Sequence, residues 1–91
     1  MKTFLISYDL LNKSMFDYSK LIEYIKSYGT WAKPLESFWL IKTTKDATTI
    51  RDEIQSKTSS NDKIVVMDVT NINWATSSVS KEVIDWMQKN V

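Results

Sequence analysis

The sequence contains no cysteine and no histidine, and these two absences remove several kinds of chemistry. Without cysteine the chain forms no disulfide bond, which fits a reducing compartment, and it has no thiol nucleophile. Without histidine it lacks the commonest general base, and an ordinary zinc site cannot form. Catalysis by this chain must therefore use carboxylates, lysine, tyrosine or hydroxyl groups, or a metal ion held by oxygen ligands.

Arginine and long apolar runs are also scarce. Arg51 is the only arginine among twelve basic residues, and the formal net charge is +1. Because arginine is the usual residue for bidentate nucleic-acid contacts, this composition counts against sequence-specific binding. No apolar run approaches the roughly 18 residues of a membrane-spanning helix, and the N-terminus lacks the pattern of a signal peptide. We therefore expect no membrane contact and a cytoplasmic location.

What the sequence does contain is typical of one small globular domain that spans residues 1–91. The hydrophobic fraction is 43% and the aromatic fraction 12%, in a chain of 91 residues. These values fit a folded domain rather than a disordered chain. The aromatic content is high for this length, so we expect some of these side chains to cover a partner as well as the core.

Apolar periodicity predicts an α+β fold. We expect strands over 3–8, 31–35, 37–43 and 62–69, and helices over 17–28, 46–57 and from 80 onward. Asp17, Asp46 (or Thr44) and Ser80 are the candidate N-caps of these helices. Gly29 stands where a left-handed residue commonly ends a helix. The order β-α-β-β-α-β, followed by a further helix, suits a ferredoxin-like sandwich.

The residue types also predict how the sheet is arranged. Pro34 cannot donate a ladder hydrogen bond, so its strand belongs at a sheet edge, while the strands of Ile6 and Leu40 are apolar on both faces and belong at the centre. We expect the first two helices to cover one face. The opposite face then carries uncovered apolar side chains, including one from Phe38 or Trp39, and homodimerisation through that face is the simplest outcome.

Several short motifs resemble the second CRISPR-associated protein family (Cas-two), whose members are small ferredoxin-like dimers. The similar segments are Tyr8-Asp9-Leu10 at the end of the first strand, Tyr28-Gly29 at the end of the first helix, and Ser37-Phe38-Trp39. The longer string over residues 28–39, together with Trp86, resembles the SinR-like branch of that group. The resemblance covers roughly residues 1–70, and the C-terminal helix resembles the branch alone.

The resemblance implies a role for Asp9. In the family the corresponding Asp is implicated in metal-dependent phosphodiester cleavage, so Asp9 is the candidate catalytic and Mg²⁺-binding residue. Other members act as structural bridges for DNA, for which the Asp is dispensable. The chain departs from the family in two places. Lys33 is the basic residue nearest the Ser-aromatic pair, where the family often has Arg, and residues 71–74 and a helix replace a further strand.

Each candidate site residue also has a plainer interpretation. Asp9 either holds a metal shared across a two-fold axis or turns the chain after its strand. Asp68 is either a second ligand or the start of a turn. The four tryptophans either stack on bases or lie in the core or an interface. The candidates for substrate contact are Ser7, Tyr8 (otherwise a core residue), Asn12, Lys13 (otherwise a solvated loop lysine), Lys33 and Ser37.

Two hypotheses of function follow from these residues. The first is a dimeric Cas-two-like protein with Mg²⁺-dependent nuclease activity on RNA or DNA, centred on Asp9. The second is a non-catalytic homodimeric interaction module that keeps the fold without the chemistry. The low net charge and the absence of histidine favour the second hypothesis, whereas the family resemblance favours the first.

Overall fold

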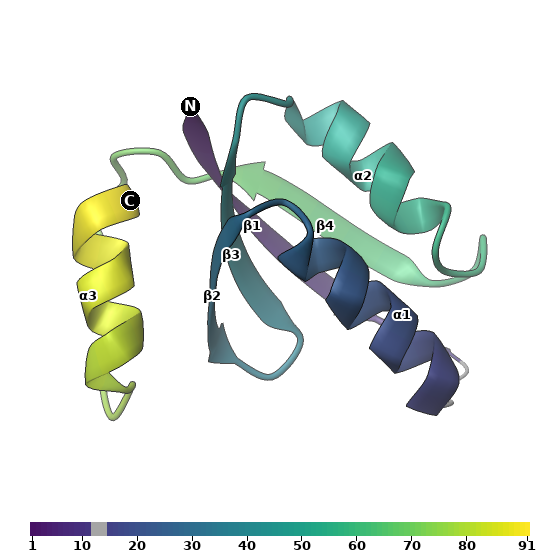
Figure 1. Cartoon of the computed structure of the whole chain (residues 1–91), viewed down its shortest axis with the longest axis horizontal. Coiled ribbons are helices and arrows are strands. Elements are labelled where there is room, and N and C mark those ends of the chain that lie inside the picture. The colour runs from purple at the N-terminus through teal and green to yellow at the C-terminus, as the bar shows by residue number, and fades with distance from the viewer. Residues whose placement is uncertain (12–14) are drawn as a thin grey trace.

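In the computed structural model, residues 1–11 and 15–91 are described, and of residues 15–17 the helical backbone alone. A four-stranded sheet lies between helices on both of its sides (Figure 1). The elements in chain order are β1 (Lys2–Asp9), α1 (Met15–Lys26), β2 (Thr30–Leu35), β3 (Phe38–Thr43), α2 (Ala47–Gln55), β4 (Lys63–Asp68) and α3 (Lys81–Asn90). The predicted α+β class is confirmed.

The sheet has the strand order β2-β3-β1-β4, and every neighbouring pair is antiparallel. The predicted positions of three strands are confirmed: β2, with Pro34, lies at an edge, and β1 and β3 are central. The β2–β3 register shifts between Ala32 and Leu35, next to the proline that cannot donate to the ladder.

One face of the sheet is closed by α1 and α2, which pack their apolar stripes against alternate residues of the strands. Ile6 and Ile41 are fully buried there, and the Trp39 side chain is 1% exposed. The Trp39 indole N–H donates to the Tyr8 hydroxyl at 3.1 Å, so the polar atoms of both rings are satisfied inside the core. We call this surface the closed face.

The opposite face is partly covered by α3, so the expectation that no helix covers it is wrong. Met87 of α3 packs against Ala32 and Leu40 on the β2–β3 half of the sheet (Figure 1). The indole N–H of Trp86 donates to the Thr30 hydroxyl at 2.8 Å. Helix α3 covers β2 and β3 because Val83, Trp86 and Met87 form one apolar stripe, as their spacing predicts.

The helix ends follow local chemistry in most cases. The Asp46 carboxylate accepts from the Thr49 N–H at 2.8 Å and caps α2, and the Ser80 hydroxyl caps α3. Gly29 has a φ of +107°, as its place after the first helix predicts. Helix α1 begins at Met15, so Asp17 lies in its first turn and the prediction that it is the N-cap is wrong.

Candidate functional site

On the β1–β4 half of the second sheet face, the C-terminal end of α3 covers β1 at fully buried Thr3, whose hydroxyl donates to the Asn90 carbonyl. The part of this half that extends from Leu5 to Asp9 and from Lys63 to Met67 is more exposed, and we call it the open half. The antiparallel register of β1 and β4 places three pairs of residues side by side on it: Leu5 with Met67, Ser7 with Val65, and Asp9 with Lys63. Val65 and Met67 are each 52% exposed, whereas Leu5 and Ser7 are half-buried. The open half is therefore an apolar surface with one charged pair at its end.

Asp9 ends β1 and is exposed to solvent. Within the described part of the chain, no hydrogen bond or ion pair holds its carboxylate. Lys63 lies directly opposite it on β4, on the same face of the sheet. Sequence reasoning missed Lys63 because the side-by-side position depends on the β1–β4 register, and a lysine at the start of a strand gives no signal by itself.

Asp68 does not lie beside Asp9, so its interpretation as a second ligand of the same metal is wrong. Antiparallel pairing sets Asp68 opposite Phe4, at the other end of the sheet. Five residues of β4 separate it from the position beside Asp9, which is about 17 Å. The Asp68 carboxylate accepts from the Thr70 N–H at 3.0 Å, and this bond holds the pKa of Asp68 below its ordinary value. Asp68 is therefore the turn residue that the sequence also allowed.

The donor groups that the structure describes in a single chain do not fit a magnesium site. Among the described residues there is no group of three acidic, histidine or cysteine side chains that could hold a metal ion. Asp9 supplies one carboxylate, and its neighbour on the same face is the Lys63 ammonium, a cation that repels a metal ion. Metal binding at Asp9 thus needs ligands from a second molecule.

The other predicted contact residues are spread over the sheet. Tyr8 is 7% exposed and points into the closed face, which favours its alternative as a core residue. Ser37, with a φ of +54°, forms the β2–β3 turn at the same end of the sheet as Asp9. Lys33 pairs with Glu36 and lies 5.3 Å from the centre of the Trp39 ring. Asn12 and Lys13 fall outside the described residues.

The tryptophans lie mainly in packed positions. Trp39 belongs to the core of the closed face, and Trp74 and Trp86 pack against the cluster beneath α3. Trp31 is 36% exposed, and its ring centre lies 5.3 Å from that of Trp39. This arrangement favours the core and interface interpretation over base stacking.

An apolar hollow adjoins the open half beneath α3. It has a volume of about 440 Å³ and is lined from the sheet by Leu5, Phe38 and Leu40, and from the C-terminal part of the chain by Trp74 and Met87. No charged side chain lines it. Leu5 belongs both to this hollow and to the open half, so the two surfaces are continuous.

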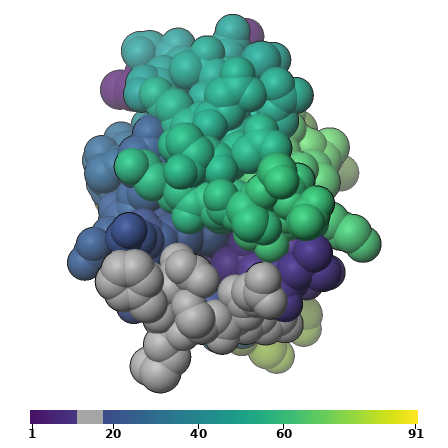
Figure 2. All heavy atoms as spheres, turned by 90° about the vertical axis from the view of Figure 1, so that its right-hand side faces the viewer, coloured from purple at the N-terminus to yellow at the C-terminus, as the bar shows by residue number. Residues whose placement is uncertain are grey.

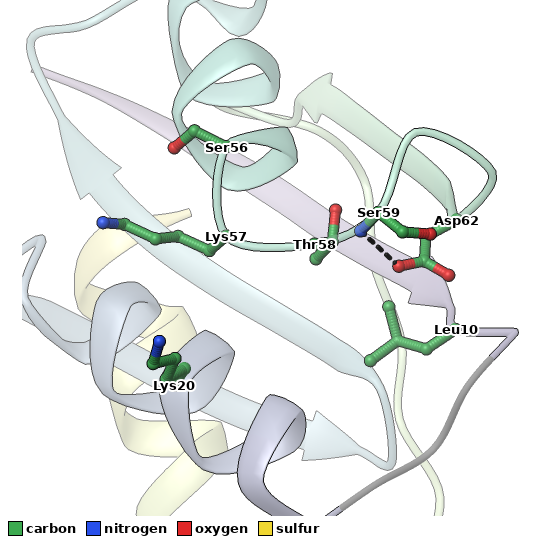
Figure 3. Close-up of a pocket in the computed structure, with 7 residues that line it drawn as sticks. All are labelled: Leu10, Lys20, Ser56, Lys57, Thr58, Ser59 and Asp62. Carbon is green, nitrogen blue, oxygen red and sulfur yellow. Dashed lines mark hydrogen bonds between the residues drawn. The ribbon is translucent and has the colours of Figure 1, made fainter.

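A second hollow, of about 400 Å³, lies between α1 and the loop after α2 (Figure 3). Figure 2 shows the green segment after α2 lying against the purple end of β1. Its carboxylate, Asp62, accepts from the N–H groups of Leu11 and Ser59, each at 2.8 Å. These bonds hold the pKa of Asp62 below its ordinary value. Lys20 and Lys57 line the same hollow near the carboxyl end of α2, where cations are favourable. These residues therefore have ordinary structural roles, and no ligand is needed to explain their presence around the hollow.

Comparison with known proteins adds no relative: no family model and no curated protein matches the chain. In the described part of the chain, no helix has the length and apolar character to cross a membrane.

Proposed function

We propose that this chain is a homodimeric interaction module with a ferredoxin-like fold of the Cas-two type, and that it associates with itself through the open half of its sheet. The strand order β2-β3-β1-β4, with α1 and α2 on one face, supports the ferredoxin-like assignment. The short motifs around Asp9 and Trp39 support the relation to the Cas-two family.

One observation carries the self-association: Val65 and Met67 are half exposed on the same face of the edge strand β4. Exposed apolar residues are common singly, but here they continue into half-buried Leu5 and the hollow beneath α3. An uninterrupted apolar surface of this kind is typical of an interface. A second copy is the simplest partner because every molecule in solution carries the same surface.

Size-exclusion chromatography with light scattering tests this proposal. The wild-type chain is expected to elute as a dimer at micromolar concentration, and the double variant Val65→Lys/Met67→Lys as a folded monomer, because two charges cannot be buried without partners. Thr48→Lys/Gln55→Lys is the matched control, because it adds two lysines at exposed positions of α2, the helix that covers the closed face. A monomeric wild type, or a dimer that survives the double variant, contradicts the proposal.

The second candidate function is Mg²⁺-dependent cleavage of RNA or DNA by the dimer. The exposed Asp9 carboxylate, which has no partner among the described residues, favours it. The described residues of one chain form no metal site, so two Asp9 carboxylates of a dimer would together supply the ligands. In the pairing proposed below each carboxylate instead faces a lysine, so the two functions differ in what Asp9 contacts.

A cleavage assay separates these functions. Structured RNA, single-stranded RNA and duplex DNA are incubated with the protein in Mg²⁺ or Mn²⁺. A nuclease that uses Asp9 loses its activity in Asp9→Asn and keeps it in Asp68→Asn, which alters the strand-end carboxylate at the far end of the sheet. Equal activity in both variants excludes Asp9, and no activity in the wild type leaves the interaction module.

A further inference from the structure

The register of β1 and β4 defines how two copies can pair. We infer that the two sheets stack face to face about a two-fold axis that runs parallel to the strands, between β1 and β4. This inference rests on the proposed self-association and specifies its geometry. Asp9 of each copy then contacts Lys63 of the other, so that two ion pairs are formed side by side at one end of the interface.

The three residue pairs of the open half fit this symmetry. A two-fold axis between β1 and β4, parallel to them, places β1 of one copy over β4 of the second at the same level along the strands. Each residue then faces the residue that is its neighbour within its own sheet. Leu5 meets Met67, Ser7 meets Val65, and Asp9 meets Lys63. The surface is complementary to itself, as a two-fold interface requires.

The alternative axis in the same plane, perpendicular to the strands at the level of Ser7, gives a poor match. It stacks β1 over β1 and β4 over β4 in opposite directions. Asp9 would then face Leu5 of the second copy, and Lys63 would face Met67. Both charges would lose water without gaining a partner, which is costly. The position of the charged pair therefore selects the axis that is parallel to the strands.

The two-fold symmetry also explains why the interface does not extend into an open-ended stack. A contact with two-fold symmetry uses the open half of both copies, so none is left for a third molecule. Packed sheets lie about 10 Å apart and are rotated by about 30° because of strand twist. Long side chains such as Met67 and Lys63 can span that separation.

Charge reversal tests the pairing. Asp9→Lys puts lysines against each other in both of the symmetry-related contacts, and Lys63→Asp does the same with carboxylates. Each variant alone is expected to dimerise at least about tenfold more weakly than the wild type, because like charges face each other in a desolvated contact. Mixed in equal amounts, the two variants regain complementary charges in both contacts. Native mass spectrometry is expected to show the mixed dimer as the main species.

The mixing step separates contacts between molecules from contacts within one chain. Within each chain, positions 9 and 63 still carry like charges after mixing. Any recovery of dimer affinity therefore arises only from contacts between chains. Asp85→Lys and Lys81→Asp on α3 are the matched controls, because these residues form an exposed ion pair at 3.0 Å away from the open half. Both controls are expected to dimerise as the wild type does.

The outcomes distinguish this inference from the proposed function. A wild-type dimer whose affinity does not change in either reversal variant overturns the pairing and leaves the self-association intact. Failure of the mixed sample to form mixed dimers also overturns the pairing. A monomeric wild type overturns both. Circular dichroism checks that each variant is folded. If either reversal unfolds the chain, Asp9→Asn and Lys63→Gln replace the reversal pair, and a smaller loss of dimer affinity is expected.

Discussion

The two faces of the sheet are built by different means. On the closed face, Ile6 and Ile41 of the sheet are fully buried beneath the helices, and so are Ile50 and Ile54 on the inner side of α2. On the other face, α3 covers β2 and β3, while Val65 and Met67 on β4 are half exposed. The difference shows that connections between strands close one face of this fold, and the segment after the last strand decides how much of the other face remains open.

The physical reason lies in the connections. Strands β1 and β2 run parallel, and so do β3 and β4, because each pair is separated by one antiparallel neighbour. Crossover connections between parallel strands are almost always right-handed, which puts α1 and α2 on the same side. Helix α3 follows the last strand and is free of this constraint, so its position depends on its own apolar stripe and on a few polar contacts.

The largest expected effect is on the closed face. Ile6→Ala should lower the free energy of unfolding by about 2–5 kcal/mol, because it leaves a cavity in a packed core. Val65→Ala on the open half should change it by less than about 0.5 kcal/mol in the monomer. Urea unfolding at low protein concentration measures both. Similar losses in the two variants would show that the faces do not differ in packing.

A smaller loss of stability is expected when a helix cap is removed. The caps of α2 and α3 allow a direct comparison of the two faces, because each helix packs on a different one. Asp46→Ala removes the cap of α2 and Ser80→Ala that of α3, each at a cost of about 1 kcal/mol. Hydrogen exchange should show the loss around α2 spread over the closed face, whose elements unfold together, and the loss around α3 confined to that helix. Global loss of protection in Ser80→Ala would show that α3 is part of the main cooperative unit.

The smallest effect is expected from acid. The pKa of Asp46 is lowered by its bond to the Thr49 N–H, and that of Asp62 by the Leu11 and Ser59 N–H groups. A carboxyl group whose pKa is lower in the folded state stabilises the fold above its unfolded pKa of about 3.9, and loses this effect as the pH falls through its folded value. Stability should therefore decline below about pH 4. Asp62→Asn should flatten that decline, as urea unfolding at pH 3 and pH 6 would show.

Much of the fold could be predicted from local residue types. Proline at position 34 predicts an edge strand, and apolar residues on both faces of the strands around Ile6 and Leu40 predict central ones, as observed. The site was less predictable. The position of Lys63, rather than Asp68, beside Asp9 depends on the direction and register of β4. Backbone hydrogen bonding does not specify that register, because its capacity is the same in any register.

The sequence by itself determined the class of the fold, the N-caps of α2 and α3 and the strand that ends in Asp9, because these depend on hydrophobic period and on hydrogen bonds between near neighbours. Tertiary structure alone decided that α3 covers half of a face expected to be bare, and that a lysine stands beside Asp9. Both depend on which distant segments meet, and that is set by the packing of whole elements rather than by the residues adjacent in the chain.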